Sequence, residues 1–133
     1  MTQEWKDAVR RGSVTELQRL FVGGADVDAR DEHGQSALML AATVGHGHVV
    51  EWLVERGAVL DRTAKYGLSA LMLAVVNGHV DVVRTLVRAG ASLGLHGTGA
   101  PGLAGKTAFD LASARDEREM LDILSSRDGD ASG

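Results

Sequence analysis

Two stretches of the sequence determine the fold: GQSALMLAATVGHGHVVEWLVERGA at residues 34–58 and GLSALMLAVVNGHVDVVRTLVRAGA at residues 67–91. They align without a gap at an offset of 33 residues. A fixed period of this length indicates stacked repeats, in which a single unit cannot bury its apolar face alone. Three series of glycines keep the same period: Gly12, Gly45 and Gly78; Gly24, Gly57 and Gly90; Gly34 and Gly67.

Each unit contains the signals for two helices. Ser36 can cap a helix over ALMLAATV by accepting a backbone N–H bond, and Gly45 can end that helix in a left-handed turn. In the segment that follows, Val50, Leu53 and Val54 have the spacing of one apolar helix face. The second unit repeats this pattern, so we predict helix, tight turn, helix and an extended connector in each.

The unit DEHGQSALMLAATVGHGHVVEWLVERGA resembles the ankyrin repeat, whose pattern is D-x-x-G-x-T-P-L-H-L-A-A-x-x-G-H-x-x-V-V-x-x-L-L-x-x-G-A. The resemblance runs from about residue 3 to 125. EWKDAVRRGSVTELQRLFVGGADVDARD is similar to an N-terminal capping repeat, with Trp5 in the place of Leu38 and Leu71, and GKTAFDLASARDEREMLDIL is similar to a shortened C-terminal cap. The resemblance implies an all-α solenoid of about four helix-turn-helix units with short β-turn connectors over residues 1–125. We expect a disordered tail over 126–133.

The departures from the family pattern concern its proline and its first histidine. The proline is replaced by Ala37, Ala70 and Ala108, and the histidine by Met39, Met72 and Asp110. Methionine can fill the space of the histidine but cannot supply its hydrogen bond. Proline suits the first position of a helix, so Ala37→Pro is predicted to stabilise the protein.

Composition narrows the class of protein. The 133 residues include no cysteine, 44% are hydrophobic, 24% are charged, and the formal net charge is -4. These values are typical of one globular domain and disfavour a nucleic-acid binder, a disulfide scaffold or a thiolate metal site. The charged N-terminus MTQEWKDAVRRG lacks a signal-peptide core, and no apolar run is long enough to span a membrane. We expect a monomer in the cytoplasm, with no nucleic-acid or membrane partner.

The stretch APGLAGKT at residues 100–107 fits a loose phosphate-binding loop, with Lys106 and Thr107 as the functional side chains. Repeat register offers a different explanation. The distance from Gly67 to Gly105 is 38 residues, so five extra residues precede the C-terminal cap, Gly105 is the connector glycine and Thr107 is the helix cap. The glycine-rich segment before it is also a poor strand. The lengthened connector is either a neutral insertion or a finger that reaches toward a partner.

No other pattern assembles catalytic or metal-binding chemistry. His46 and His48 do not share a helix face, and His46 and His79 match the structural GH of the family. GQS and GLS lack the second glycine of a nucleophile elbow, and the acids of DARDEHGQ are explained by a solvated connector. We predict no enzymatic activity, no cofactor and no metal.

The resemblance implies a binding surface made of connector tips and first-helix residues. The leading interpretation is a non-catalytic module that binds another protein there, with Tyr66 near the centre as the aromatic anchor. One alternative is an inhibitor or immunity-type protein that blocks an enzyme, and another, of a different class, is a nucleotide-binding protein that uses residues 100–107. The candidate contact residues are Arg10, Arg11, Arg30, Glu32, His33, Gln35, Thr43, Val44, Lys65, Tyr66, Leu68, Val76 and Asn77.

Overall fold

The computed structural model describes the backbone of residues 1–132 and the side chains of residues 1–125. The described backbone contains eight α-helices and one short 3-10 helix, so the predicted all-α fold is confirmed. The predicted disordered tail, 126–133, falls on residues whose side chains lie outside the described part, and it stays a prediction. The helices are α1 (Gln3–Arg11), α2 (Val14–Val22), α3 (Ala37–Val44), α4 (Gly47–Glu55), η1 (Lys65–Gly67), α5 (Ala70–Val76), α6 (Val80–Ala89), α7 (Ala108–Arg115) and α8 (Arg118–Ser132).

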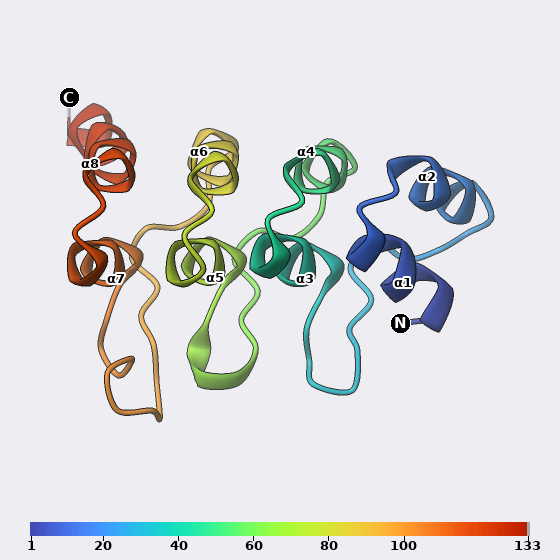
Figure 1. The fold of residues 1–133 in the computed structure, drawn as a ribbon, viewed down its shortest axis with the longest axis horizontal. Coiled ribbons are helices and arrows are strands. Elements are labelled where there is room, and N and C mark those ends of the chain that lie inside the picture. The colour runs from blue at the N-terminus through green and yellow to red at the C-terminus, as the bar shows by residue number, and fades with distance from the viewer. Residues whose placement is uncertain (133) are drawn as a thin grey trace.

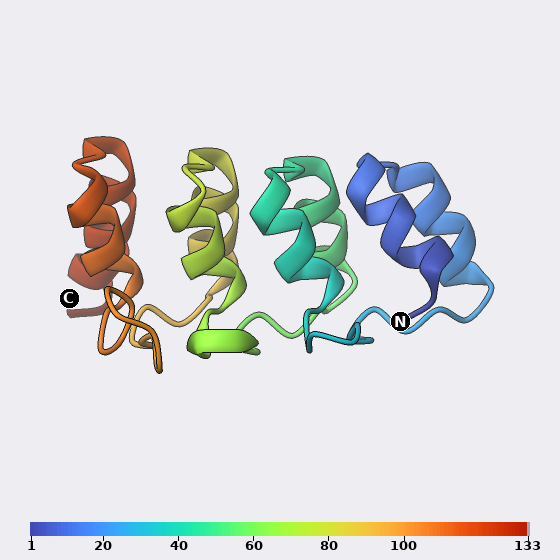
Figure 2. The same ribbon diagram turned by 60° about the horizontal axis from the view of Figure 1, so that its bottom comes forward.

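The helices form four antiparallel pairs that stand side by side (Figure 1). The first helices of the pairs, α1, α3, α5 and α7, form an inner row, and α2, α4, α6 and α8 form an outer row. Three connectors project from the inner row on the side away from the outer row: the first at 23–36, the second at 56–69 and the third at 90–107 (Figure 1, Figure 2). Connectors and inner row together make an L-shaped surface along the stack.

The helix starts are where the repeat pattern places them. Ser36, Ser69 and Thr107 each have extended backbone and accept a hydrogen bond from the N–H three residues further on. Gly45 and Gly90 follow their helices in the left-handed conformation. The predicted caps and helix-ending glycines are therefore confirmed, because both depend only on local backbone chemistry.

The core lies between the two rows and between neighbouring units. Trp5, Leu38 and Leu71 occupy equivalent positions, and each is 1% exposed. Met39 and Met72 are also buried, so methionine fills the place of the family histidine, as expected. At the end of the stack, the equivalent Phe109 is 41% exposed.

Neighbouring units are joined by histidine rings. His46 Nε2 lies 2.8 Å from the Arg10 carbonyl oxygen, and His79 Nε2 lies 3.0 Å from the Thr43 carbonyl oxygen. Since a carbonyl only accepts, each Nε2 donates. The rings rest on the glycine that ends the preceding inner helix, so a Cβ on Gly45 would lie 2.6 Å from the His79 ring. These contacts agree with the structural interpretation of the GH histidines.

The last unit makes the same connection with a different side chain. Glu117 stands in register with His79, and Arg115 replaces the histidine by donating from Nη1 to the Val76 carbonyl oxygen at 3.0 Å. Glu117 Oε1 holds the guanidinium at 2.7 Å from Nη2. The link between units is thus kept although the residue that makes it has moved two positions.

Candidate partner-binding surface

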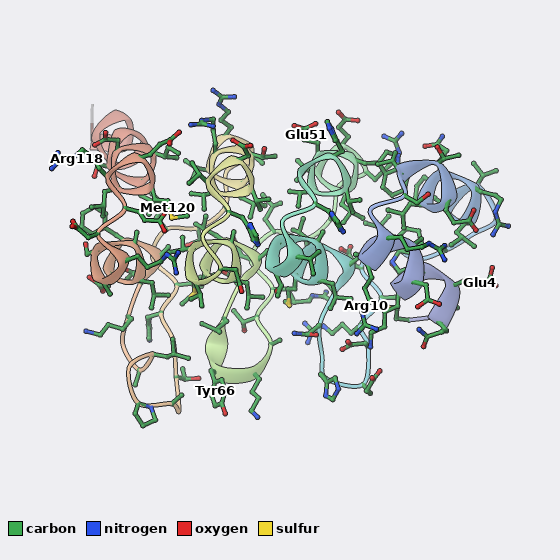
Figure 3. The ribbon with its side chains drawn as sticks, in the orientation of Figure 1. Glu4, Arg10, Glu51, Tyr66, Arg118 and Met120 are labelled. Carbon is green, nitrogen blue, oxygen red and sulfur yellow. The ribbon has the colours of Figure 1, made fainter. Side chains whose placement is uncertain are left out.

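The candidate contact residues lie along two edges of the L-shaped surface. One group occupies the C-terminal ends of the inner helices: Arg10, Arg11, Thr43, Val44, Val76 and Asn77. The other group lies on the first and second connectors: Arg30, Glu32, His33, Gln35, Lys65, Tyr66 and Leu68. An inner helix of eight residues is about 12 Å long, so the two groups border one surface and do not form a single cluster. Figure 3 shows Tyr66 at the tip of the second connector, well apart from Arg10 on α1.

The side chains in these groups differ in availability. Val44, Val76 and Tyr66 are among the large apolar side chains that remain exposed. The Thr43 hydroxyl is committed to the Met39 carbonyl, to which it donates at 2.9 Å. Leu68 is partly buried and packs against the core. Among the candidate contact residues, the available large apolar side chains are therefore the two valines and the tyrosine.

The first connector is organised around Asp31. Its Oδ1 accepts backbone N–H bonds from His33 and Gln35, both at 2.9 Å, and its Oδ2 lies 3.1 Å from Lys6 Nζ. The Asp31 side chain is only 1% exposed. The expectation of solvated connector acids is thus wrong for Asp31, because Lys6, at the position of the family histidine, reaches across from α1. Glu32 also contacts Lys6 Nζ, at 3.2 Å.

These contacts shift the pKa values of Asp31 and Lys6. Burial raises the pKa of the Asp31 carboxyl, but the N–H bonds from Gln35 and His33 and the bond from Lys6 outweigh it, and the net pKa is lowered. The hydrogen bonds to Asp31 and Glu32 raise the pKa of Lys6. Both groups are therefore charged in the folded protein at neutral pH.

The second connector lacks this carboxylate. Ala64 stands in register with Asp31, and the turn contains η1, in which Tyr66 adopts the left-handed conformation at φ 63°. Tyr66 is 39% exposed, and Lys65 Nζ lies 4.9 Å from the centre of its ring. A bulky residue rarely adopts this backbone conformation, which costs about 1–2 kcal/mol. Tyr66 is thus held in a strained backbone at the tip of the connector.

The third connector, lengthened by the five-residue insertion, contains an ordered turn over residues 97–105. We call this turn the finger. Gly97 N donates to the Lys106 carbonyl and Gly105 N to the Gly97 carbonyl, both at 2.9 Å. Thr98 N donates to the Tyr66 carbonyl at 2.7 Å, so the finger is bonded to the second connector. The sequence left open whether the insertion is a finger, and its contribution to the shape of the surface was not predicted.

The geometry around Thr107 disfavours phosphate binding. The Thr107 N–H and hydroxyl both donate to Asp110 Oδ2 at 3.1 Å, which completes a capping box. The N–H bond from Thr107, followed by the bond from its hydroxyl, lowers the pKa of Asp110, so a carboxylate occupies the position that a bound phosphate would need. Thr107 acts as the helix cap that repeat register predicts.

Comparison with known proteins agrees with this arrangement. The model of the family described as "Ankyrin repeats (3 copies)" matches residues 6–97. The chain therefore belongs to the ankyrin-repeat family. It is also similar to human "Ankyrin repeat domain-containing protein 29", with 47% identity over 51 residues, which are 38% of this chain and 17% of the human protein.

Ankyrin repeats are generally protein–protein interaction modules, and the family is generally non-enzymatic. Among the described residues, no helix is both long and apolar enough to cross a membrane. The chain spans a small part of the human relative, so the activity and partners of that whole protein carry over only as proposals.

Proposed function

We propose that this protein is a non-catalytic interaction module that binds one partner protein on the L-shaped surface, with Tyr66 near the centre of the contact. The observation that carries the proposal is the half-exposed Tyr66 in a left-handed backbone at a connector tip. Strained backbone positions occur where function requires a particular placement of a side chain. Exposed tyrosine is also a common anchor of protein interfaces.

The neighbouring residues supply the rest of an ordinary interface. Val44 and Val76 expose apolar area at the ends of α3 and α5. Exposed Arg10 and Arg11 continue that edge on α1, and Asn77 lies beside Val76. Protein interfaces combine apolar contacts with polar and charged neighbours, and this surface offers both. A monomer located in the cytoplasm belongs to the same proposal.

The experiment is purification of partners from native extract on the tagged full chain, followed by affinity measurement with the partner found. Tyr66→Ala should weaken that affinity by about 30-fold, the effect of losing one anchor worth about 2 kcal/mol. Val22→Ala, which removes another exposed apolar side chain at the end of α2, is the matched control and should leave the affinity unchanged. Equal affinities of wild type and Tyr66→Ala would refute the proposal.

Two other functions remain distinguishable. An inhibitor or immunity-type protein would use the same surface, and its partner would be an enzyme that loses activity in the complex. Nucleotide binding through residues 100–107 conflicts with the Asp110 carboxylate at the Thr107 cap. Calorimetric titration with ATP or GTP and magnesium should therefore give no heat of binding.

A further inference from the structure

We infer that the partner presents an acidic segment to the part of the surface built by the second connector and the finger. We call this part the tip platform. Its side chains come from the second connector, the finger and the two residues that flank the finger: Lys65, Tyr66, His96, Thr98 and Lys106. The inference rests on the proposed function and specifies the chemistry of the partner.

The second connector and the finger form one hydrogen-bonded body. Thr98 N is bonded to the Tyr66 carbonyl, and a Cβ on Gly67 would lie 3.1 Å from the His96 carbonyl oxygen. On the other side of the turn, a Cβ on Gly99 would meet Tyr66 Cδ1 at 3.8 Å. The backbone of the finger therefore approaches the connector at van der Waals distance, and the two elements present one surface to a partner.

Charge is distributed unevenly over the connectors. The chain has a net charge of -4, yet the only carboxylate between residues 62 and 109 is Asp81, which lies on α6 in the outer row. The second connector contains one carboxylate, Asp61, which accepts a hydrogen bond from Ser92 N at 2.7 Å. The first connector, in contrast, contains four carboxylates and one arginine: Asp26, Asp28, Asp31, Glu32 and Arg30. The tip platform is thus a cationic region on an acidic protein, and an acidic segment matches its charge.

The two lysines of the platform are available for binding. Lys65 and Lys106 are both exposed, and Lys65 lies over the ring of Tyr66. The nearest carboxylate that follows in the sequence, Asp110, is bonded to the Thr107 cap. The N–H and hydroxyl bonds from Thr107 lower the pKa of Asp110 most, and the charge of Lys106 also contributes. An acidic side chain of a partner can pair with the lysines while an adjacent apolar side chain packs on the tyrosine. Two lysines are too few for tight nucleic-acid binding, which depends on several phosphate contacts, so an acidic protein segment fits better.

The probe for this inference is a random peptide library displayed on phage and selected on the immobilised full chain. We expect the selected peptides to be enriched in Asp and Glu next to an apolar residue. Synthetic copies should bind at least tenfold more weakly to Lys65→Glu/Lys106→Glu, and their affinity for wild type should fall as salt rises, since these charges are exposed. The matched control, Arg88→Glu/Arg118→Glu, makes the same change in net charge on the outer row and should bind like wild type (Figure 3 labels Arg118).

The possible outcomes separate this inference from the proposed function. Neutral or basic peptides whose binding depends on Tyr66 but not on the lysines would refute the inference that the partner segment is acidic. The proposed binding surface would still stand. Peptides that ignore both Tyr66→Ala and the lysine variant, or no selected peptides at all, would count against both. A single-stranded DNA oligonucleotide is tested in parallel. If it binds as tightly as the peptides and responds to the same variants, the platform is a general polyanion site and the inference is wrong.

Discussion

The first and second connectors make an equivalent backbone hydrogen bond, but the side-chain and tertiary contacts that hold them differ. In both, the backbone N–H of the residue three before the connector glycine donates to the carbonyl of the residue four further on. Asp31 N donates to the Gln35 carbonyl at 2.9 Å, and Ala64 N donates to the Leu68 carbonyl at 3.1 Å. The first turn is filled by the Asp31 carboxylate, which also binds Lys6. The second has no such carboxylate and is bonded instead to Thr98 of the finger.

This difference shows how a repeat protein can vary the tip of one connector while the stack of helix pairs stays the same. A local side-chain contact at Asp31 keeps the first connector in ordinary backbone conformations up to Gly34. In the second connector both Tyr66 and Gly67 have the left-handed conformation. The finger supports this turn through the bond from Thr98 N to the Tyr66 carbonyl. The support leaves the Tyr66 side chain exposed, so the second connector is better suited to contact a partner.

The largest effect on stability is expected from Asp31→Ala, which makes the first connector resemble the second without a finger to support it. The change removes two bonds to backbone N–H groups and leaves the buried Lys6 with Glu32 as its remaining acidic partner. We expect the free energy of unfolding, measured by urea denaturation, to fall by about 2–3 kcal/mol. Ala64→Gly is the matched control at the equivalent site, and a loss as large there would show that Asp31 has no special role.

The pH dependence of the same contact has a defined sign. The pKa of Asp31 is lowered in the folded state, so its contribution to stability is complete above the unfolded value of about 3.9 and is lost as pH falls through the folded value. Denaturation midpoints of wild type and Asp31→Asn should therefore converge as pH decreases below about 4. A constant difference between the two proteins down to the lowest pH would contradict the assignment.

The next largest effect is expected from Gly97→Ala, which breaks the support of the second connector. The new Cβ would lie 2.9 Å from the Leu103 carbonyl carbon, too close for the finger to keep its turn. Unfolding free energy should fall by about 1–2 kcal/mol, with faster amide hydrogen exchange at Thr98, whose N–H is bonded to the Tyr66 carbonyl. Gly94→Ala is the control, because its Cβ would approach only Ser92 Oγ, at 4.0 Å. Unchanged exchange at Thr98 would mean that the finger does not depend on Gly97.

A smaller effect, of opposite sign, is expected where each connector enters its helix. Ser36 and Ser69 precede α3 and α5 with nearly the same extended angles, φ -88° and ψ 168°, and φ -89° and ψ 171°. These angles suit a residue before proline, so Ala37→Pro and Ala70→Pro should each stabilise the protein by about 0.5–1 kcal/mol. Thermal denaturation checks both variants. Unequal gains in stability would show that the backbone geometry at the starts of α3 and α5 differs.

The smallest effect on stability is expected from Tyr66→Gly. Glycine relieves the left-handed backbone, and we expect a gain of about 0.5 kcal/mol in unfolding free energy, measured by urea denaturation. Binding of the partner should nevertheless weaken, because the exposed ring is gone. A variant that is less stable than wild type would show that the ring contributes more to packing than its exposure suggests.

Much of the fold was predictable because its signals are local. Ser36, Ser69 and Thr107 cap their helices, and Gly45 ends α3, because these functions depend on backbone geometry within a few residues. The binding surface was predictable only in outline. The sequence placed Tyr66 at a connector tip, but it did not reveal that Leu68 packs against the core or that Thr98 bonds to the Tyr66 carbonyl.

The periodic sequence was sufficient to identify the number of units, the helix caps and the apolar faces, since all of these repeat with the chain. The contacts that break the period required the folded structure: Lys6 with Asp31, Arg115 with the Val76 carbonyl, and Thr98 with the Tyr66 carbonyl. Each joins residues at least 25 positions apart and occurs at only one place in the stack. Their geometry depends on how neighbouring units lie against each other, which local propensity and spacing do not specify.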